Sequence, residues 1–378
     1  MAGVLAMASL IDDAGVRMIP MNDLSRGISR DRLLLEESIR DVLDSGYVVM
    51  GPRHKAFEGA LAEYLGVEHA LGVASGTDAL ELAIKTVMPA GKSVVLTAAN
   101  AGGYTSVAAR RAGFDVRYAD VDAETLCISL DTLEAALDSE VGVVVITHLY
   151  GRLTDIRGLV EHCHARGVRV VEDCAQAIGA RLDGRSAGSF GDVAAISFYP
   201  TKNLGAIGDG GAVVTSDEQI AREVAQLRQY GWSSKYSIAI PGGVNSRLDE
   251  IQAAILLARL PLLDGFNQRR REIVERYRVA ASDGPLRVLA ADGEHHVAHL
   301  AVALASDRDD VRARLEAGGV HTDVHFPVPD YAQPGLGSAQ ARLPTTHAVA
   351  GQIFSLPCFP ELRDDEIQQV CDAIKALR

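Results

Sequence analysis

The sequence has little cysteine and no long apolar segment. Its five cysteines are scattered, odd in number and without CxxC spacing, which favours reduced thiols over a disulfide framework. No apolar run approaches the roughly 20 residues that a membrane span requires. The first residues also lack the basic start and the cleavage site of a signal peptide. We therefore expect a cytoplasmic protein that has no membrane partner.

The chain also lacks an excess of positive charge and several familiar motifs. It carries 37 basic and 50 acidic residues, a net charge of −13, which argues against nucleic acid as the main partner. GxGxxG, P-loop and HExxH motifs are absent, so nucleotide hydrolysis and zinc proteolysis lose their usual support. Histidines cluster at 162–164, on an expected helix where neighbouring side chains diverge, and at 295–299, where HHVAHLAVALA predicts a strand with polar edges. We predict no metal at either cluster.

Short apolar segments alternate with amphipathic ones along most of the chain. This rhythm predicts an α/β fold with a mostly parallel sheet covered by helices, in which ligands gather at the carboxyl ends of the strands. The expected strands include 93–97, 115–119, 142–147, 168–172, 194–198 and 212–215. The expected helices include 31–45, 52–65, 131–138, 156–166, 216–230, 248–263 and 266–281.

The length and the 48% hydrophobic content suit about two domains. Residues 1–18 have no periodic apolar face, so we expect them to form a flexible extension. We predict a large domain at 19–264 and a smaller C-terminal α/β domain at 265–378, with a long charged helix joining the two.

One stretch, AISFYPTKNLGAIGDGGAVVT at 195–215, places Lys202 in a turn between two apolar strands. A lysine in such a turn is either an ordinary surface residue or an amine that is desolvated or used covalently. The polar groups at the ends of the neighbouring strands bear on this choice.

Each of those groups has an ordinary reading when it is taken alone. SGT at 75–77 begins a helix. This segment is either a simple helix cap or an anion site made of backbone amides. A carboxylate just after an apolar strand, as in VVEDCAQAIGA, is usually a turn or helix cap, and a lone tyrosine usually packs. The groups are Gly76, Thr77, Tyr104, Asp173, Gln176 and Ser197.

Together these groups match one chemical need. A cofactor with a phosphate, an aldehyde and a pyridine nitrogen requires an anion site, a lysine amine and a carboxylate. The carboxylate keeps the ring nitrogen protonated, so that the ring can accept electrons. An aromatic face would stack on the ring.

The ordered motifs of the chain resemble those of the DegT/DnrJ/EryC1/StrS family of sugar aminotransferases. The similarity runs from about Ile19 to the C-terminus. That family has the fold type I architecture and uses pyridoxal 5′-phosphate, so the resemblance implies both. The motifs are SGTDAL, HLYG at 148–151, EDCAQAIGA, SFYPTKNLGAIGDGGAVVT, NSRLDEIQAAIL at 245–256 and LPCFPEL at 356–362.

The resemblance implies roles for the residues around the cofactor ring. Lys202 is similar to the Schiff-base lysine, and Asp173 to the partner of the pyridine nitrogen. Gln176 then bonds the ring hydroxyl. The chain departs from the common pattern in TAANAGGYTS at 97–106, where many relatives have a Phe or Trp, and Tyr104 is our candidate for the stacking residue.

The resemblance also implies a phosphate site. Gly76, Thr77 and Ser197 match the residues that hold the phosphate, and the backbone amide of Asp78 is a further donor while its charged side chain points away. Asn245 resembles the residue that reaches the phosphate across a subunit interface. This implies a homodimer with shared active sites.

The expected reaction is transfer of an amino group from an amino acid, L-glutamate, to a nucleotide-linked keto-deoxyhexose. TDVHFPVPDY at 322–331 resembles a segment of relatives that aminate dTDP-3-keto-6-deoxyhexoses, although a proline-stiffened structural loop is an equal reading. His325 and Tyr230 are the candidate substrate contacts, and amination at carbon 3 is the expected position.

Three alternatives remain. A cyclitol aminotransferase would differ only in the acceptor. A related sugar dehydratase would carry histidine in place of Lys202. A non-catalytic regulatory protein on the same scaffold is disfavoured by intact Lys202, Asp173 and Gln176.

Overall fold

A computed structural model describes residues 18–336 and 342–378. The predicted extension at 1–18 therefore lies, except for Met18, outside the described residues. Among the described residues, no helix combines the length and the apolar character that crossing a membrane would take.

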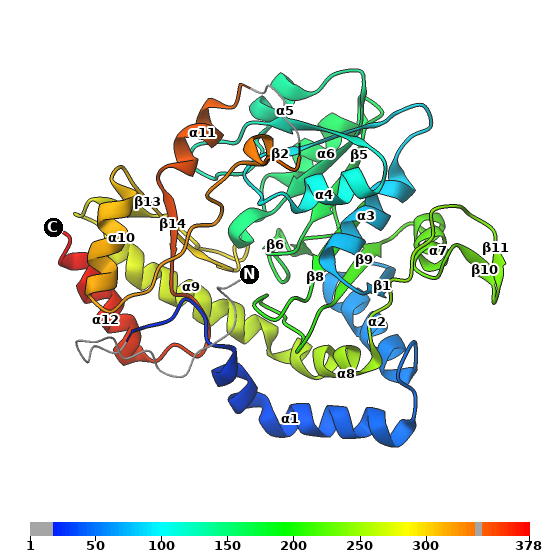
Figure 1. Cartoon of the computed structure of the whole chain (residues 1–378), viewed down its shortest axis with the longest axis horizontal. Coiled ribbons are helices and arrows are strands. Elements are labelled where there is room, and N and C mark those ends of the chain that lie inside the picture. Colours follow the sequence, from blue (N-terminus) through cyan, green and yellow to red (C-terminus); the bar gives the residue numbers. More distant parts are fainter. Residues whose placement is uncertain (1–17, 337–341) are drawn as a thin grey trace.

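The centre of the molecule is a seven-stranded sheet with the order β1-β9-β8-β5-β4-β2-β3 (Figure 1). β9 is antiparallel to both of its neighbours, and all other adjacent strands are parallel. This confirms the α/β fold with a mostly parallel sheet. The strands are β1 (His69–Val73), β2 (Val94–Ala98), β3 (Asp115–Ala119), β4 (Val141–Thr147), β5 (Arg169–Asp173), β8 (Val193–Ser197) and β9 (Gly211–Thr215).

Helices cover both faces of this sheet because the strand side chains alternate between two apolar cores. In β4, Val143 and Val145 join one core, whereas Val144 and Ile146 join the other. The first core is closed by α3 (Gly76–Val87), α4 (Tyr104–Arg111) and α7 (Glu218–Leu227). The second is closed by α2 (Pro52–Leu65), α5 (Leu130–Ala136), α6 (Ile156–His164) and α8 (Glu250–Arg259).

A separate core lies in the C-terminal part, which Figure 1 shows to the left of the large sheet. It forms between α9 (Leu263–Ala280), a small antiparallel sheet and two helices. The first described residues join it, since Ile19 is buried there and pairs with Val320. The other elements are β12 (Leu286–Val288), β13 (Ala301–Ala305), β14 (Ile353–Leu356), α10 (Arg308–Ala317) and α12 (Asp364–Lys375). The domain boundary at 264/265 stays a prediction, and it falls inside α9.

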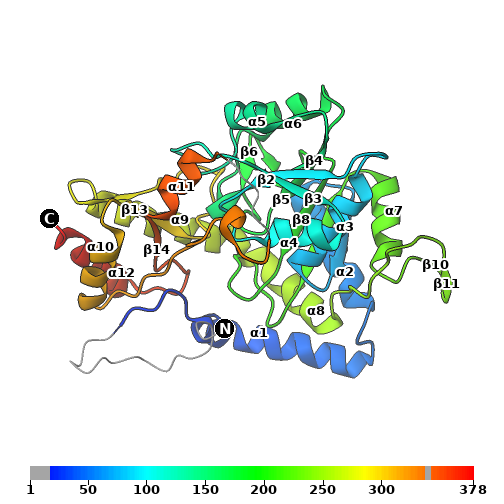
Figure 2. The ribbon, with the colours of Figure 1, turned by 45° about the horizontal axis from the view of Figure 1, so that its top comes forward.

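Two segments leave these layers. α11 (Pro344–Ala350) lies against the edge of the large sheet, because Asp120 at the end of β3 accepts the N–H groups of Thr345 and Thr346 at 2.9 and 2.8 Å. The hairpin of β10 (Trp232–Ser234) and β11 (Ser237–Ile238) projects away from the body in both views (Figures 1 and 2). Smaller elements are α1 (Leu24–Ser45), β6 (Arg181–Leu182), β7 (Arg185–Ser186) and the single turns Leu149–Gly151, Leu260–Leu262 and Asp330–Ala332.

The expected strand at 295–305 is wrong in its first half. Regular pairing begins only at Ala301, where β13 starts, and Ala298 has a φ of 48° that interrupts an extended chain. His296 and His299 are buried in this irregular segment. Two helix ends also differ: α1 starts earlier because Asp23 caps it, and α7 stops at Leu227, before the positive φ of Tyr230.

Candidate active site

Several of the predicted site residues lie where neighbouring strands end. Asp173 is the last residue of β5, where it pairs with Thr147, the last residue of β4. Ser197 is the last residue of β8 and pairs with Gly211, the first of β9. In a parallel sheet these ends share one edge, so residues far apart in the chain meet there.

The start of α3 lies against the end of β8. A Cβ atom on Gly76 would come within 2.6 Å of Ser197 Cβ, and one on Gly211 within 2.4 Å of the Ser75 carbonyl oxygen. Only glycine fits at these two contacts. Ser75 caps the helix by accepting the Asp78 N–H at 3.1 Å, which leaves the N–H groups of Gly76 and Thr77 as the donors for an anion.

The side chain of Asp78 takes no part in this anion site. It accepts a hydrogen bond from Arg111 at 3.0 Å and from the Ser246 hydroxyl at 2.8 Å. The Asp78 carboxylate thus has partners of its own, and its backbone amide, the expected further phosphate donor, is already bound to the Ser75 side chain.

Asp173 is buried at the end of β5. Its oxygens accept hydrogen bonds from the Ala175 N–H at 3.1 Å and from the Thr147 hydroxyl at 3.2 Å. Burial raises the pKa of this carboxyl, and the Ala175 N–H and the charge of Lys202 oppose the rise. Asp173 is thus fixed in position and has a cation as its neighbour.

Lys202 lies in a turn after β8, held by its N–H bond to the Tyr199 carbonyl at 2.8 Å. Burial lowers the pKa of its amine to about 8, against the attraction of Asp173. The amine is consequently neutral in a large fraction of molecules near pH 8, unlike an ordinary lysine. That is the form which attacks a carbonyl carbon.

A buried polar network anchors the turn directly behind Lys202. Asn203 donates to the Asn267 side chain of α9 at 2.7 Å and to the Val297 carbonyl at 3.0 Å, and its Oδ1 lies 2.9 Å from His299 Nδ1. Since Asn203 Oδ1 only accepts, Nδ1 of His299 is the donor. Burial, followed by the charge of Lys202, holds the pKa of His299 well below its usual value, so the network is neutral.

Gln176 lies next to the turn Leu149–Gly151. Its Oε1 accepts the Tyr150 N–H at 2.6 Å. This bond fixes the orientation of the amide, so that Nε2 is the group that can donate to a ligand.

Tyr104 is the first residue of α4 and is 53% exposed, so it is not an interior packing residue. Its ring meets Phe326 edge-on at 5.9 Å, and Phe326 covers Gly102, where a Cβ would come within 2.9 Å of that ring. Burial raises the pKa of Tyr104, and the nearby Tyr199 raises it further by a smaller amount. Three aromatic rings therefore gather near the end of β8.

The two candidate substrate residues lie in different places. His325 bonds the Ser355 hydroxyl through Nδ1 at 3.0 Å, and its pKa is lowered by burial and also by the charge of Lys202. It therefore lies near Lys202, and its role as a substrate contact stays a prediction. Tyr230 instead lies at the base of the β10–β11 hairpin with Trp232, their ring centroids 5.1 Å apart. Asn245 is exposed and pairs with Gln229 at the same base.

A buried histidine, carboxylate and thiol lie beneath the site. His148, Glu172 and Cys174 are the one such group in the described ranges whose possible metal-binding atoms lie within 4.8 Å of one another. Glu172 already bonds His148 at 2.9 Å and accepts the N–H groups of Gly188, Phe190 and Gly191 at 3.0, 2.7 and 2.7 Å. These contacts explain the group as a structural anchor.

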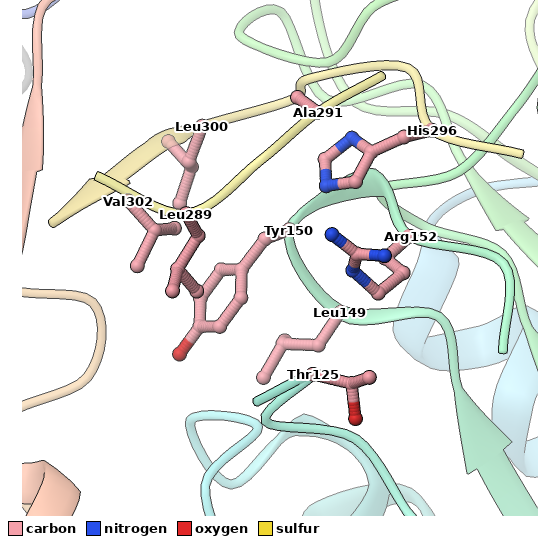
Figure 3. A pocket seen from close by; sticks show the side chains of 9 residues that line it. All are labelled: Thr125, Leu149, Tyr150, Arg152, Leu289, Ala291, His296, Leu300 and Val302. Carbon is pink, nitrogen blue, oxygen red and sulfur yellow. The ribbon is translucent and has the colours of Figure 1, made fainter. Parts of the chain in front are cut away.

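Two hollows lie near these elements, and neither is the strand-end site. The smaller, of about 10 Å³, lies between the turn Leu149–Gly151 and residues 289–302 (Figure 3). In Figure 3, Arg152 and His296 face each other across it, and it has room for about one water molecule. The larger, of about 170 Å³, includes Lys202 but no other predicted cofactor residue.

The site fits a cofactor that carries a phosphate, an aldehyde and a pyridine ring. Free amides beside Ser197 suit the phosphate, the Lys202 amine suits the aldehyde, and the fixed Asp173 carboxyl suits a protonated ring nitrogen. The sequence alone did not reveal Thr147, Tyr199 or the Asn203 network. Thr147 comes just before the HLYG motif, Tyr199 and Asn203 lie inside SFYPTKNLGA, and His299 lies in a histidine cluster, whereas no motif contains Asn267.

Comparisons with known proteins identify the family of the chain. Residues 32–375 match the model of the DegT/DnrJ/EryC1/StrS aminotransferase family. The chain is 39% identical to dTDP-3-amino-3,4,6-trideoxy-alpha-D-glucose transaminase of Micromonospora megalomicea, over 92% of this chain and 95% of that protein. It is 34% identical to the pleiotropic regulatory protein of Geobacillus stearothermophilus, over 94% and 97%.

Solved structures give the same result. DesV of S. venezuelae superposes with a TM-score of 0.91 at 35% identity, covering 95% of this chain and 98% of that one. Ntda of Bacillus subtilis, solved with the cofactor PMP bound, superposes with a TM-score of 0.89 at 28% identity, covering 95% and 85%. The chain belongs to the DegT/DnrJ/EryC1/StrS aminotransferase family, and it is a sugar aminotransferase with the fold type I architecture.

Proposed function

We propose that this sugar aminotransferase uses pyridoxal 5′-phosphate to move an amino group from L-glutamate to carbon 3 of a dTDP-linked keto-deoxyhexose. One observation carries the proposal: Lys202, with its lowered pKa, lies beside the fixed carboxyl of Asp173 at neighbouring strand ends. Burial lowers the pKa of any lysine, so it is the carboxyl at the neighbouring strand end that distinguishes Lys202 from a structural lysine.

When bound, pyridoxal phosphate supplies an aldehyde that exchanges amines and a ring that accepts an electron pair. The N–H groups of Gly76 and Thr77 and the Ser197 hydroxyl bind its phosphate. Asp173 keeps the ring nitrogen protonated by placing a carboxylate next to it.

Two further side chains contact the ring. Gln176 Nε2 donates to the ring hydroxyl, because Oε1 is already occupied by the Tyr150 N–H. Tyr104 covers the ring face.

Lys202 Nζ is the group that moves protons. With the amino donor bound, its neutral amine would take the proton from the α-carbon of the donor. In the return half of the reaction it delivers a proton to carbon 3 of the sugar. The pKa of about 8 suits both tasks, since the amine gains and loses a proton near neutral pH.

The acceptor is inferred from relatives and from the 322–331 segment. Relatives named for amino groups at carbon 3 of dTDP or UDP sugars are 34–39% identical to this chain. His325 is our candidate for a sugar contact, because it lies close enough to Lys202 for the lysine charge to lower its pKa. A ketocyclitol is the alternative acceptor.

We further propose a homodimer in which Asn245 completes the phosphate site of the partner subunit. Two observations support it. The β10–β11 hairpin projects from the body with Tyr236 and Ile238 79% and 69% exposed, and apolar side chains of this kind favour contact with another chain. Asn245 is exposed at the base of the hairpin. Tyr230 would then line the shared site.

The proposed compartment is the cytoplasm. All five cysteines are free and buried, a state that a reducing environment maintains.

The test is to incubate the protein with L-glutamate, pyridoxal phosphate and a panel of acceptors. The panel contains dTDP-3-keto and dTDP-4-keto deoxyhexoses, a UDP-3-keto sugar and a ketocyclitol, and products are identified by mass spectrometry and NMR. We expect a dTDP-3-amino sugar. Lys202→Ala should lose at least about 10²–10⁴-fold in turnover. The proposal fails if no nucleotide sugar is aminated, or if Lys202→Ala keeps its activity.

A non-catalytic regulatory role is the second candidate, because one relative of this chain is named a pleiotropic regulatory protein. The two candidates differ in cofactor uptake. A purified protein that stays colourless and takes up no pyridoxal phosphate would favour the regulatory role.

A further inference from the structure

Asp330 is a fully buried carboxyl between the C-terminal part and the large sheet. It begins the turn Asp330–Ala332, and none of its surface is exposed. Its Oδ2 accepts a hydrogen bond from the Ser106 hydroxyl of α4 at 2.6 Å, and the Ser106 oxygen lies 3.2 Å from the Tyr118 hydroxyl of β3. The Gly103 N–H also faces the carboxyl. A buried charge with only neutral partners costs free energy, so a carboxyl at this position indicates a specific role.

The segment that ends at Asp330 connects two parts of the molecule past the active site. It leaves the small sheet at Asp323, which pairs with Ser355 of β14. The Tyr150 hydroxyl donates to the His325 carbonyl at 3.0 Å. At the far end, the Asp330 N–H donates to the Ala99 carbonyl after β2 at 2.8 Å.

The position of His325 consequently depends on both ends of this segment. We propose that Asp330 is a positioning residue that fastens the segment 322–331 to α4 through Ser106, and thereby keeps His325 over the sugar part of the site. The inference rests on the proposed function in one respect, namely that His325 has a sugar to contact.

The chemistry of Asp330 predicts how the docking depends on pH. Burial raises its pKa to about 6, against the hydrogen bonds from Ser106 and Gly103, whereas a free aspartate titrates near 3.9. The docked segment therefore binds the proton more tightly than a released one. Through Asp330 alone, docking strengthens as the pH falls from 8 to 5, roughly tenfold in the ratio of docked to released segment. The Tyr118 hydroxyl also faces the carboxyl, and burial raises its pKa further above this range. Burial lowers the pKa of His325 in the same segment, so protonation of His325 opposes docking as the pH falls.

Hydrogen exchange tests this directly on the full-length protein. Protection of the amides at 322–331, corrected for the intrinsic pH dependence of exchange, is compared between the wild type and Asp330→Asn. The ratio of wild-type to variant protection should be roughly tenfold greater at pH 5 than at pH 8, because the amide has the same shape but does not titrate, while His325 titrates in both proteins. Ser106→Ala should lower protection at pH 8. Asp309→Asn is the control, since it alters an exposed carboxyl outside the segment and should keep the wild-type dependence.

Kinetics then connects the docking to the reaction. The KM of Asp330→Asn for the keto sugar, divided by that of the wild type, should rise as the pH falls from 8 toward 5, while the half-reaction with the amino donor stays the same. The same pH dependence of protection in the wild type and in Asp330→Asn overturns the docking. If Asp330→Asn changes the hydrogen exchange of 322–331 as expected but its KM relative to the wild type stays constant with pH, the positioning role is wrong. If the wild type aminates no sugar, the proposed function fails, but the exchange experiment still decides the docking.

Discussion

At the scale of single residues, the surroundings of Lys202 change its chemistry. Burial moves the pKa of its amine to about 8, although Asp173 attracts the charge. Desolvation of the Lys202 amine itself is the larger of the two effects, so it outweighs this attraction. The same amine on the surface would be almost fully protonated at neutral pH.

The lowered pKa predicts how the apoprotein takes up cofactor. Its folded value lies below the ordinary value of about 10.4, so the neutral amine is present in about half of the molecules at pH 8 instead of about 0.4%. The rate of pyridoxal phosphate uptake at Lys202, followed by absorbance, should rise from pH 7 to 9 with a midpoint near 8.

Two controls separate this effect from titration of the free cofactor. Nα-acetyl-lysine, which keeps a free ε-amine, should react with the same cofactor without a midpoint near 8. Lys202→Ala should show no such uptake. A rate that continues to rise without levelling toward pH 10 would contradict the lowered pKa.

At the scale of elements, α2 depends on a cap that comes from another helix. Its own N-cap residue is Gly51, which has no side chain to accept a hydrogen bond. Glu250, at the start of α8, instead accepts the N–H groups of Gly51, Arg53 and His54 at 2.7, 2.6 and 3.2 Å. Glu250 is fully buried, and its charge also suits the positive end of α2. One carboxylate thus fixes α2 and α8 relative to each other.

Removing this carboxylate should destabilise the protein markedly. Glu250→Ala leaves three N–H groups without acceptors, so we expect a loss of about 2–3 kcal/mol in the free energy of unfolding. Urea unfolding followed by circular dichroism measures it. Glu36→Ala, on the exposed face of α1, is the control and should change stability by less than about 0.5 kcal/mol. Equal effects of the two substitutions would show that the cap contributes nothing.

At the scale of the whole molecule, the active site draws on elements from end to end of the chain. The sheet edge supplies the cofactor residues, α9 and the C-terminal part hold the Lys202 turn through Asn267 and His299, and segment 322–331 returns to α4. In the proposed homodimer, the projecting hairpin and Asn245 of a second subunit also contribute to the active site.

The shared site predicts that two inactive variants rescue each other. In a dimer of one Lys202→Ala subunit and one Asn245→Asp subunit, one of the two sites has both native residues. Random exchange makes half of the dimers mixed, so about a quarter of all sites should become active. Unfolding and refolding the variants together, then assaying amination, measures this. Light scattering gives the subunit number, and activity no higher than the sum of the separate variants would refute sharing between subunits.

The sequence by itself determined the strands of the large sheet and the residues at their ends. Apolar runs such as 115–119 predicted β3 with the bounds that it has, and α2 also has its predicted bounds, because local hydrophobic period and glycine stops decide such elements. Motif spacing likewise identified Lys202 and Asp173. Both depend on short stretches of chain, which the sequence records directly.

Only the tertiary structure decided what these groups experience. The lowered pKa of Lys202, the carboxyl of Asp330 against Ser106, and the burial of His299 against Asn203 all join residues far apart in the chain. The wrong prediction of a strand at 295–300 has the same cause. The alternating pattern of this segment predicts a strand, but distant residues bury its histidine side chains in an irregular conformation. Desolvation and long-range hydrogen bonding come from packing, and no local pattern of residues encodes them.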